Sequence, residues 1–374
     1  MGNYLKKNCI GAWAAQFDSN GLLWLSDFNL GGLYKYNLEE KKLEFEYMFN
    51  DIEFGQERMH GLMIIKGLDI FLFPMSDKYV RIYNIKSKSE TKIQLPEENV
   101  NDNIIVNDND NVWLINNKCY YFDFEIKTFK VDQMLTDLYS GINNVNQKNI
   151  RFKASDNVIT IWDSDDKELY VYDYIQKKYE TIIINNIDEK IMDLYRMKSK
   201  YWIILENSHH IYSRELSDDN YIKYYSDNND YIDNKFNIPF GMLYNLNNKL
   251  ILSNYYGRYI MVINEDIKKV ECVFPDKQNN EITDCLDYGA CYYRVLQYND
   301  YIYFIPQRAR EILKCDRNLS LIGRYSMQIS VNNDFLNKVF KSEENKYGVV
   351  NEKKDYLNII DYINYIIHKE GEKY

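Results

Sequence analysis

The stretch Tyr298–Tyr325, YNDYIYFIPQRAREILKCDRNLSLIGRY, contains the pattern that decides the fold. After an Asn-Asp turn comes an apolar run at Tyr301–Ile305, and a polar loop follows at Pro306–Arg310. A second run, Glu311–Asp316, ends at an Arg-Asn turn, beyond which a third run begins. Asn and Asp form turns readily because they tolerate the left-handed region of backbone space and bond their own backbone. The stretch therefore predicts three successive β-strands joined by short loops.

The same unit recurs along the whole chain. Each time, a turn precedes an apolar strand, a short polar loop and a second strand that ends in Asn, Asp or Glu. These closing residues are Asn37, Asn84, Asp123, Asp173, Glu215, Asn264 and Asp316. They follow one another at about 40–50 residues, a period that is typical of a β-propeller with four strands in each blade when it is built from strands alone. One four-stranded sheet cannot bury both of its faces, so blades arranged around an axis cover one another.

Across roughly residues 9–330 the chain resembles the seven-bladed β-propellers. It lacks the Gly-His and Trp-Asp marks of WD40 repeats and, apart from Gly31-Gly32, the Gly-Gly pairs of kelch repeats. The predicted fold class is all-β, a seven-bladed β-propeller of four-stranded antiparallel blades over residues 1–331. Counting repeats leaves six or eight blades open. The first and last units each contain four strands, so we expect the ring to close by side-chain packing without strand exchange.

The pattern changes to a helical one in residues 332–374, which we predict to be a helical extension. In Asp355–Lys369, apolar residues recur at helical spacing along one stripe, and Gly371 can end the helix. The many β-branched residues lower the intrinsic helix propensity, so this helix needs a surface to pack against. It is expected either to seal the propeller or to serve in docking or dimerisation.

Composition and charge exclude several classes of partner. With 36 Tyr and 17 Phe among 374 residues, the chain is rich in side chains that pack well on strands. Its net charge of −10 argues against nucleic acid and against an anionic membrane surface. No apolar run reaches the roughly 18 residues that span a membrane, and no signal-peptide core is present, so we predict a cytoplasmic protein. The six cysteines lack zinc-site spacing and are interpreted as buried and reduced.

By analogy of fold, a ligand is expected at the mouth of the central channel, on the face that carries the loops between second and third strands. The residues predicted there are rich in arginine for an acidic protein. They are Arg58, His60, Tyr255, Tyr256, Arg258, Gln307, Arg308 and Arg310. Arginine matches carboxylate or phosphate and tyrosine adds a flat wall, so the set predicts a pocket for an anionic ligand or an acidic peptide. Alternatively, these arginines pair with loop carboxylates at Asp27, Asp77 and Glu311.

His60 is the residue that we would assign to acid–base chemistry. It stands beside Gly61 at the start of an inner strand and could face the channel, although a structural role fits the same position. No H-E-x-x-H, G-x-S-x-G, P-loop or G-x-G-x-x-G motif occurs. The acidic runs lack the glycine and the final glutamate of an EF-hand. We therefore predict neither a cofactor nor a metal site.

Three classes of function fit these observations. The one that we favour is a non-catalytic binding or scaffold propeller that recognises a peptide, a partner protein or a small anionic ligand at the channel mouth. The alternative is a propeller enzyme of lyase, hydrolase or peptide-modifying type, with His60 as acid or base and the arginines holding substrate. The third is a small-molecule or glycan sensor that uses Tyr255 and Tyr256 for stacking.

Overall fold

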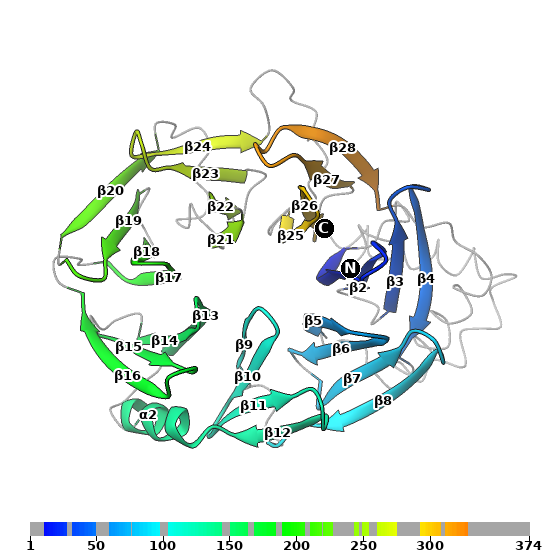
Figure 1. The fold of residues 1–374 in the computed structure, drawn as a ribbon, viewed down its shortest axis with the longest axis horizontal. Helices are drawn as coiled ribbons and strands as arrows, with labels where there is room; N and C mark the ends of the chain where they lie inside the picture. Colours follow the sequence, from blue (N-terminus) through cyan, green and yellow to red (C-terminus); the bar gives the residue numbers. More distant parts are fainter. Residues whose placement is uncertain are drawn as a thin grey trace, which may run out of the picture. The chain divides into compact units, whose positions relative to one another are not determined.

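In the computed structural model, the chain folds as a seven-bladed β-propeller of four-stranded antiparallel blades, each pairing its strands in chain order (Figure 1). This confirms the fold class and the number of blades predicted from the repeats. The structure describes residues 11–27, 32–49, 60–75, 77–97, 104–143, 150–163, 168–184, 189–205, 210–218, 220–226, 243–246, 249–253, 260–274, 292–307 and 311–327. The chain divides into two compact units, of which the first holds blades 1, 2 and 7 and the second holds blades 3 to 6. The predicted tail helix, Asp355–Lys369, lies outside the described residues.

The first unit joins the two ends of the repeat array. Blade 1 consists of β1 (Ala12–Phe17), β2 (Leu23–Asp27), β3 (Gly32–Asn37) and β4 (Lys42–Met48). Blade 2 consists of β5 (His60–Lys66), β6 (Asp69–Pro74), β7 (Tyr79–Asn84) and β8 (Ser89–Gln94). Blade 7 consists of β25 (Tyr292–Tyr298), β26 (Tyr301–Pro306), β27 (Glu311–Cys315) and β28 (Leu321–Ser326). The last three are the strands that the Tyr298–Tyr325 pattern predicts.

The second unit holds four blades and the described helix. Blade 3 consists of β9 (Ile104–Asp108), β10 (Asn111–Ile115), β11 (Cys119–Asp123) and β12 (Thr128–Val131). Blade 4 consists of β13 (Ile150–Ser155), β14 (Val158–Asp163), β15 (Glu168–Asp173) and β16 (Lys178–Ile183). Blade 5 consists of β17 (Ile191–Met197), β18 (Lys200–Leu205), β19 (His210–Glu215) and β20 (Tyr221–Ser226). Blade 6 consists of β21 (Leu243–Leu246), β22 (Lys249–Ser253), β23 (Ile260–Asn264) and β24 (Lys269–Phe274).

Two features of this unit are not predicted by the repeat. Helix α2 (Gln133–Asn143) follows β12 and packs Leu135, Leu138 and Ile142 into the core that blades 3 and 4 share. In addition, β20 and β24 pair in parallel, with Tyr225 opposite Lys269, so that blades 5 and 6 form one eight-stranded sheet. An outermost strand has unpaired backbone groups, and this pairing covers two such edges at once.

The third and fourth strands of a blade are joined by a repeated hairpin. The closing Asn or Asp found in the sequence accepts hydrogen bonds from the next backbone N–H groups: Asn84 Oδ1 from Ser87 at 2.9 Å, and Asp173 Oδ1 from Gln176 at 2.7 Å. In blades 1, 2, 3, 4 and 6, a lysine in the left-handed region stands four residues after the closing residue. These lysines are Lys41, Lys88, Lys127, Lys177 and Lys268, with φ between 52° and 54°. The side chain of the closing residue thus sets the turn, while lysine occupies a position that glycine adopts more easily.

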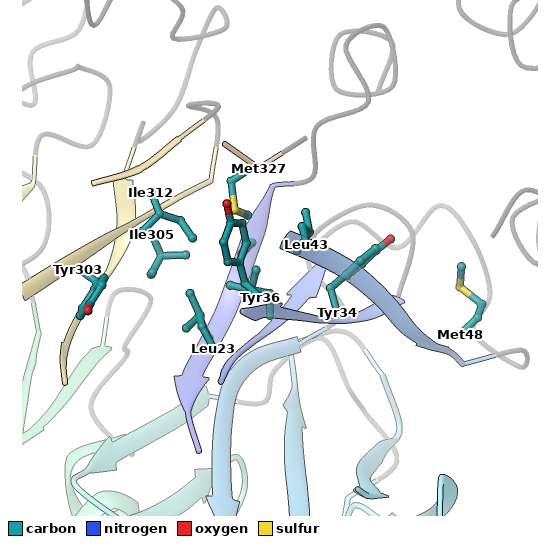
Figure 2. Close-up of a cluster of buried hydrophobic side chains, with 12 residues drawn as sticks. Leu23, Tyr34, Tyr36, Leu43, Met48, Tyr303, Ile305, Ile312 and Met327 are labelled. Atoms are coloured by element: carbon teal, nitrogen blue, oxygen red, sulfur yellow. The ribbon is translucent and has the colours of Figure 1, made fainter. Parts of the chain in front are cut away.

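The contact between the last blade and the first is made of side chains. Leu23, Tyr34, Tyr36 and Leu43 of blade 1 form one buried cluster with residues of blade 7 (Figure 2). The blade 7 members are Tyr303, Ile305, Ile312 and Met327. Each of the two sheets has its own four strands and neither borrows one from the other. The expectation that these blades meet by packing without strand exchange is confirmed for the described residues.

Candidate functional site

Two of the eight predicted site residues lie in the described part of the chain. His60 begins β5, and Gln307 directly follows β26, with 5% of its surface exposed. The other six, Arg58, Tyr255, Tyr256, Arg258, Arg308 and Arg310, lie outside the described residues. His60, at the start of β5, lies opposite Pro74 at the end of β6, the second strand of blade 2. Gln307 directly follows the end of β26, the second strand of blade 7. The two residues therefore lie at the same edge of their respective blades within the first unit.

His60 is a buried residue, and one of its two ring nitrogens lacks a hydrogen-bond partner among the described residues. Only 1% of its surface is exposed, and its Nδ1 lies 2.8 Å from Ser26 Oγ on blade 1. The Phe49 ring packs against the imidazole edge-on, with the ring centroids 5.4 Å apart. Burial, with a smaller contribution from the charge of Arg81, lowers the pKa of His60 to about 3. The imidazole is therefore neutral near pH 7, and its buried Nε2 has no hydrogen-bond partner among the residues that the structure describes.

The chain beside His60 depends on a glycine. The register of β5 against β6 shifts between His60 and Leu62, which leaves Gly61 at a β-bulge. A Cβ atom on Gly61 would lie 2.5 Å from Met75 Cγ, closer than side-chain atoms approach one another. The Gly61 in the sequence is thus explained by the close passage of Met75 over the bulge.

Blade 2 also contains a buried network of ion pairs centred on Arg81. Arg81, 1% exposed, donates from Nε to Asp77 Oδ2 and from Nη1 to Glu90 Oε1, both at 2.6 Å. Its guanidinium also lies over the Phe49 ring, 5.3 Å from the centroid. Asp77, which the sequence offered as a partner for the arginines of the predicted site, is therefore engaged by Arg81. Similarly, Glu311 lies 3.5 Å from Arg324.

Sequence reasoning missed Arg294, an arginine on the inner strand of blade 7. Its Nε donates to the carbonyl oxygen of Trp13 at 3.0 Å, and its Nη2 donates to that of Gly61. Both carbonyls belong to bulged positions on the inner strands of blades 1 and 2. One guanidinium thus bridges three blades within the first unit. The available signal was a charged residue inside an apolar inner strand, YYRVLQY.

The second unit contains a similar contact, in which an arginine of one inner strand bonds a carbonyl oxygen of the next blade. Arg151 of β13 donates from Nη1 to the carbonyl oxygen of Met192 at 2.6 Å. Met192 lies at the register shift of β17, the inner strand of the next blade. Because a bulge leaves one residue out of the ladder, its carbonyl is available to such a donor. An inner-strand arginine that holds the bulge of a neighbouring blade is therefore a recurring contact in this protein.

Other reactive groups are few in the described part of the chain. No cluster of three or more His, Cys, Asp or Glu side chains suited to a metal ion occurs among the residues that the structure describes. Cys119 and Cys315 are buried free thiols, as predicted, and burial raises the pKa of each to about 12. Within the described ranges no helix has the length and apolarity required to cross a membrane.

No protein-family model matches the chain, and no curated protein sequence matches it. Solved structures do. A virginiamycin B lyase from Staphylococcus aureus with quinupristin is similar with a TM-score of 0.56 and 10% identity, over 81% of this chain and 94% of that one. YCF48 bound to D1 peptide is similar with a TM-score of 0.56 and 12% identity, over 87% and 95%. The extracellular domain of a hybrid two component system from B. thetaiotaomicron has a TM-score of 0.51 and 13% identity, over 80% of this chain and 39% of that one. Likeness at this level of identity shows the fold alone, and the chain is a divergent seven-bladed β-propeller outside the typical WD40 and kelch groups.

Proposed function

We propose that the protein is a non-catalytic binding or scaffold propeller that holds a peptide, a partner protein or an anionic ligand at the mouth of its channel. The observation that carries the proposal is the state of His60. The side chain with the best claim to acid–base work is buried, neutral near pH 7 and joined to Ser26 through Nδ1. A general base needs access to the proton that it removes and a pKa near the working pH. A recognition role needs neither.

Structural neighbours support both this proposal and its alternative. YCF48, which shares the fold, was solved bound to a peptide, and this favours recognition of a peptide. A streptogramin B lyase shares the propeller fold with the same TM-score of 0.56, at 10% identity. The enzyme alternative therefore keeps His60 as its acid or base, with the arginines of the predicted site holding substrate. The two differ in what happens to the ligand, which is retained in one case and converted in the other.

The test is an array of random decapeptides probed with the full-length chain. We expect bound peptides to be enriched in Asp and Glu, because arginine forms charge-assisted hydrogen bonds worth about 1.5–3 kcal/mol each with carboxylates. The double variant Arg308→Ala, Arg310→Ala should bind the best acidic peptide about tenfold or more weakly. Arg317→Ala is the matched control, because Arg317 is an exposed arginine in a β27–β28 turn that pairs with Asp300.

Two results would reject the proposal. One is an array without any peptide bound above background. The other is release of peptides in altered form, which mass spectrometry of the eluted material detects and which would favour the enzyme. If His60→Ala abolished that conversion while the melting temperature stayed unchanged, His60 would be the catalytic acid or base.

We further propose that residues 332–374 form an extension separate from the propeller of residues 1–331, with Asp355–Lys369 as a packing or docking helix. The apolar stripe in the sequence supports this proposal. Ile363→Asp should lower the melting temperature if the stripe packs on the propeller, and should change only the oligomeric state or partner capture if it docks. Size-exclusion chromatography with light scattering separates these results, and no change in either would contradict a buried stripe.

A further inference from the structure

Three buried polar atoms at the interface between blades 4 and 5 have no hydrogen-bond partner among the described residues. They are Thr160 Oγ1, Tyr201 Oη and Arg196 Nε. Thr160 has 0% of its surface exposed and Tyr201 has 1%, so bulk solvent does not reach either hydroxyl. A buried polar atom that loses its hydrogen bonds to water without gaining others destabilises the fold. Three such atoms at one interface are therefore best explained by a small polar molecule that bonds them.

The two hydroxyls come from facing sheets. Thr160 lies between Val158 and Trp162 on β14, and alternate residues of a strand share one face. Val158 and Trp162 belong to one buried cluster with Tyr201 of β18. The indole of Trp162 also donates to the carbonyl oxygen of Ile191 on β17 at 3.2 Å. Thr160 therefore faces blade 5 on the side where Tyr201 lies.

Arg196 comes from the inner strand of blade 5. It lies directly opposite Tyr201 where β17 pairs with β18, and its backbone N–H donates to Ser155 Oγ of blade 4 at 3.1 Å. Its Nε is 4.0 Å from Asp156 Oδ2, which is longer than a hydrogen bond. Burial raises the pKa of Tyr201 to about 12, whereas the charge of Arg196 and the Thr160 hydroxyl lower this pKa. Both groups therefore lie close enough to the phenol to act on it.

We propose that one buried water molecule binds between Thr160, Tyr201 and Arg196 and joins blade 4 to blade 5. Its donors and acceptors balance: the water oxygen accepts from Arg196 Nε–H and from the Tyr201 hydroxyl, and one water hydrogen is donated to Thr160 Oγ1. Three partners are the usual number for a buried water. A chloride ion would also accept from these donors, but the nearby carboxylates of Asp156 and Glu180 oppose a negative charge.

A crystal structure of the full-length protein tests the site directly. We expect one ordered water with its oxygen about 2.7–3.2 Å from Arg196 Nε, Tyr201 Oη and Thr160 Oγ1. A second crystal soaked in bromide distinguishes water from an anion, because bromide gives an anomalous signal and water does not. No anomalous peak is expected at the site.

Two variants that each remove one hydroxyl test the role of the water in stability. Thr160→Val and Tyr201→Phe should each lower the folding equilibrium constant about fivefold, measured by urea unfolding with tryptophan fluorescence. The double variant should lose less than the product of the two single effects, because both hydroxyls act through one water. Thr136→Val is the matched control, since Thr136 is a buried threonine whose hydroxyl accepts from the Cys119 N–H at 3.0 Å. Its effect should combine with that of Tyr201→Phe as a simple product.

Four results would overturn the proposal. The first is a direct hydrogen bond between Tyr201 and Thr160 in the crystal, with no water between them. The second is a bromide peak at the site, which would assign it to an anion. The third is a simple product of effects in the Thr160 and Tyr201 double variant. The fourth is an unchanged or raised folding constant in either single variant, because the removed hydroxyl would then have had no partner. If a variant does not fold, the crystal structure of the unchanged protein decides.

Discussion

The buried His60 side chain connects two blades and has a lowered pKa. It joins blade 2 to blade 1 through Ser26 and Phe49. Burial is the main cause of its lowered pKa, and the charge of Arg81 lowers the pKa further. That guanidinium is itself bonded to Asp77 and Glu90. Protonation of His60 would place a second cation beside a buried first one, which is unfavourable. Burial and the charge of Arg81 therefore make the folded state favour the neutral imidazole.

This gives a prediction about acid stability. Because the pKa of His60 is lowered to about 3 in the folded protein and is near 6.5 when unfolded, the unfolded state takes up a proton first as the pH falls. The stabilisation is complete above about pH 6.5 and is lost toward pH 3, at about 1.4 kcal/mol per pH unit. Urea unfolding of the protein and of His60→Gln between pH 7.5 and 4.5 measures the difference, which should shrink as the pH falls. A constant difference would contradict the lowered pKa.

The sequence indicates which side chains of the site are polar, but not how they are engaged. Gly61 and His60 stand out at the start of an apolar strand, and the structure explains the glycine by its approach to Met75. The burial of His60 depends on Ser26 and Phe49 of another blade, so no local pattern reveals it. Arg294 is missed for the same reason, since its partners lie 281 and 233 residues away in the chain.

At the scale of elements, the repeated hairpin is the part of the fold that the sequence predicts best. Its signal is local, because the Asn or Asp that closes the third strand bonds the next few backbone N–H groups. Helix α2 also has a local signal, the spacing of Leu135, Leu138 and Ile142, but a helix falls outside the strand repeat. The parallel pairing of β20 with β24 has none, since it depends on two outer strands meeting in space.

The lysine in the left-handed region of these hairpins predicts a stabilising substitution. Lys127 has φ of 52°, so Lys127→Gly should raise the free energy of unfolding by a few tenths to about 1 kcal/mol. Lys127→Val should lower it by about 1 kcal/mol or more, because a β-branched residue is strained there. Lys92→Gly is the control within strand β8, where glycine should destabilise by about 0.5–1 kcal/mol. Thermal unfolding gives all three values, and a loss of stability in Lys127→Gly would contradict the hairpin geometry.

At the scale of the molecule, the contact between blades 7 and 1 joins residues from the two ends of the repeat array. Its buried cluster includes Ile305 and Ile312 of blade 7 with Leu23 and Tyr36 of blade 1 (Figure 2). Aromatic rings extend it, with Phe17 stacked on Tyr298 at a centroid distance of 4.5 Å. Among the described residues no strand is shared across this contact, so it is held by side-chain packing together with the hydrogen bond that Arg294 donates to the Trp13 carbonyl oxygen.

Substitution of one isoleucine tests that dependence. Ile312 is fully buried in the cluster, so Ile312→Ala should lower the free energy of unfolding by about 2–5 kcal/mol. Ile322 lies on the next strand of the same blade and is 51% exposed, so Ile322→Ala should change stability by about 0.5 kcal/mol or less. Denaturant unfolding with tryptophan fluorescence reads both variants. Similar losses in the two would show that this contact does not hold the blades together.

The same contact has a consequence for how the chain can be rearranged. Ala12, at the start of the first described strand, and Met327, just beyond the last, belong to one cluster, and every blade is a single continuous piece of chain. A circular permutant that links these ends by a short peptide and opens between two other blades would leave every sheet intact. Each of its blades would keep the neighbours that it has now. The order in which the gene encodes the blades would then not be required by the fold.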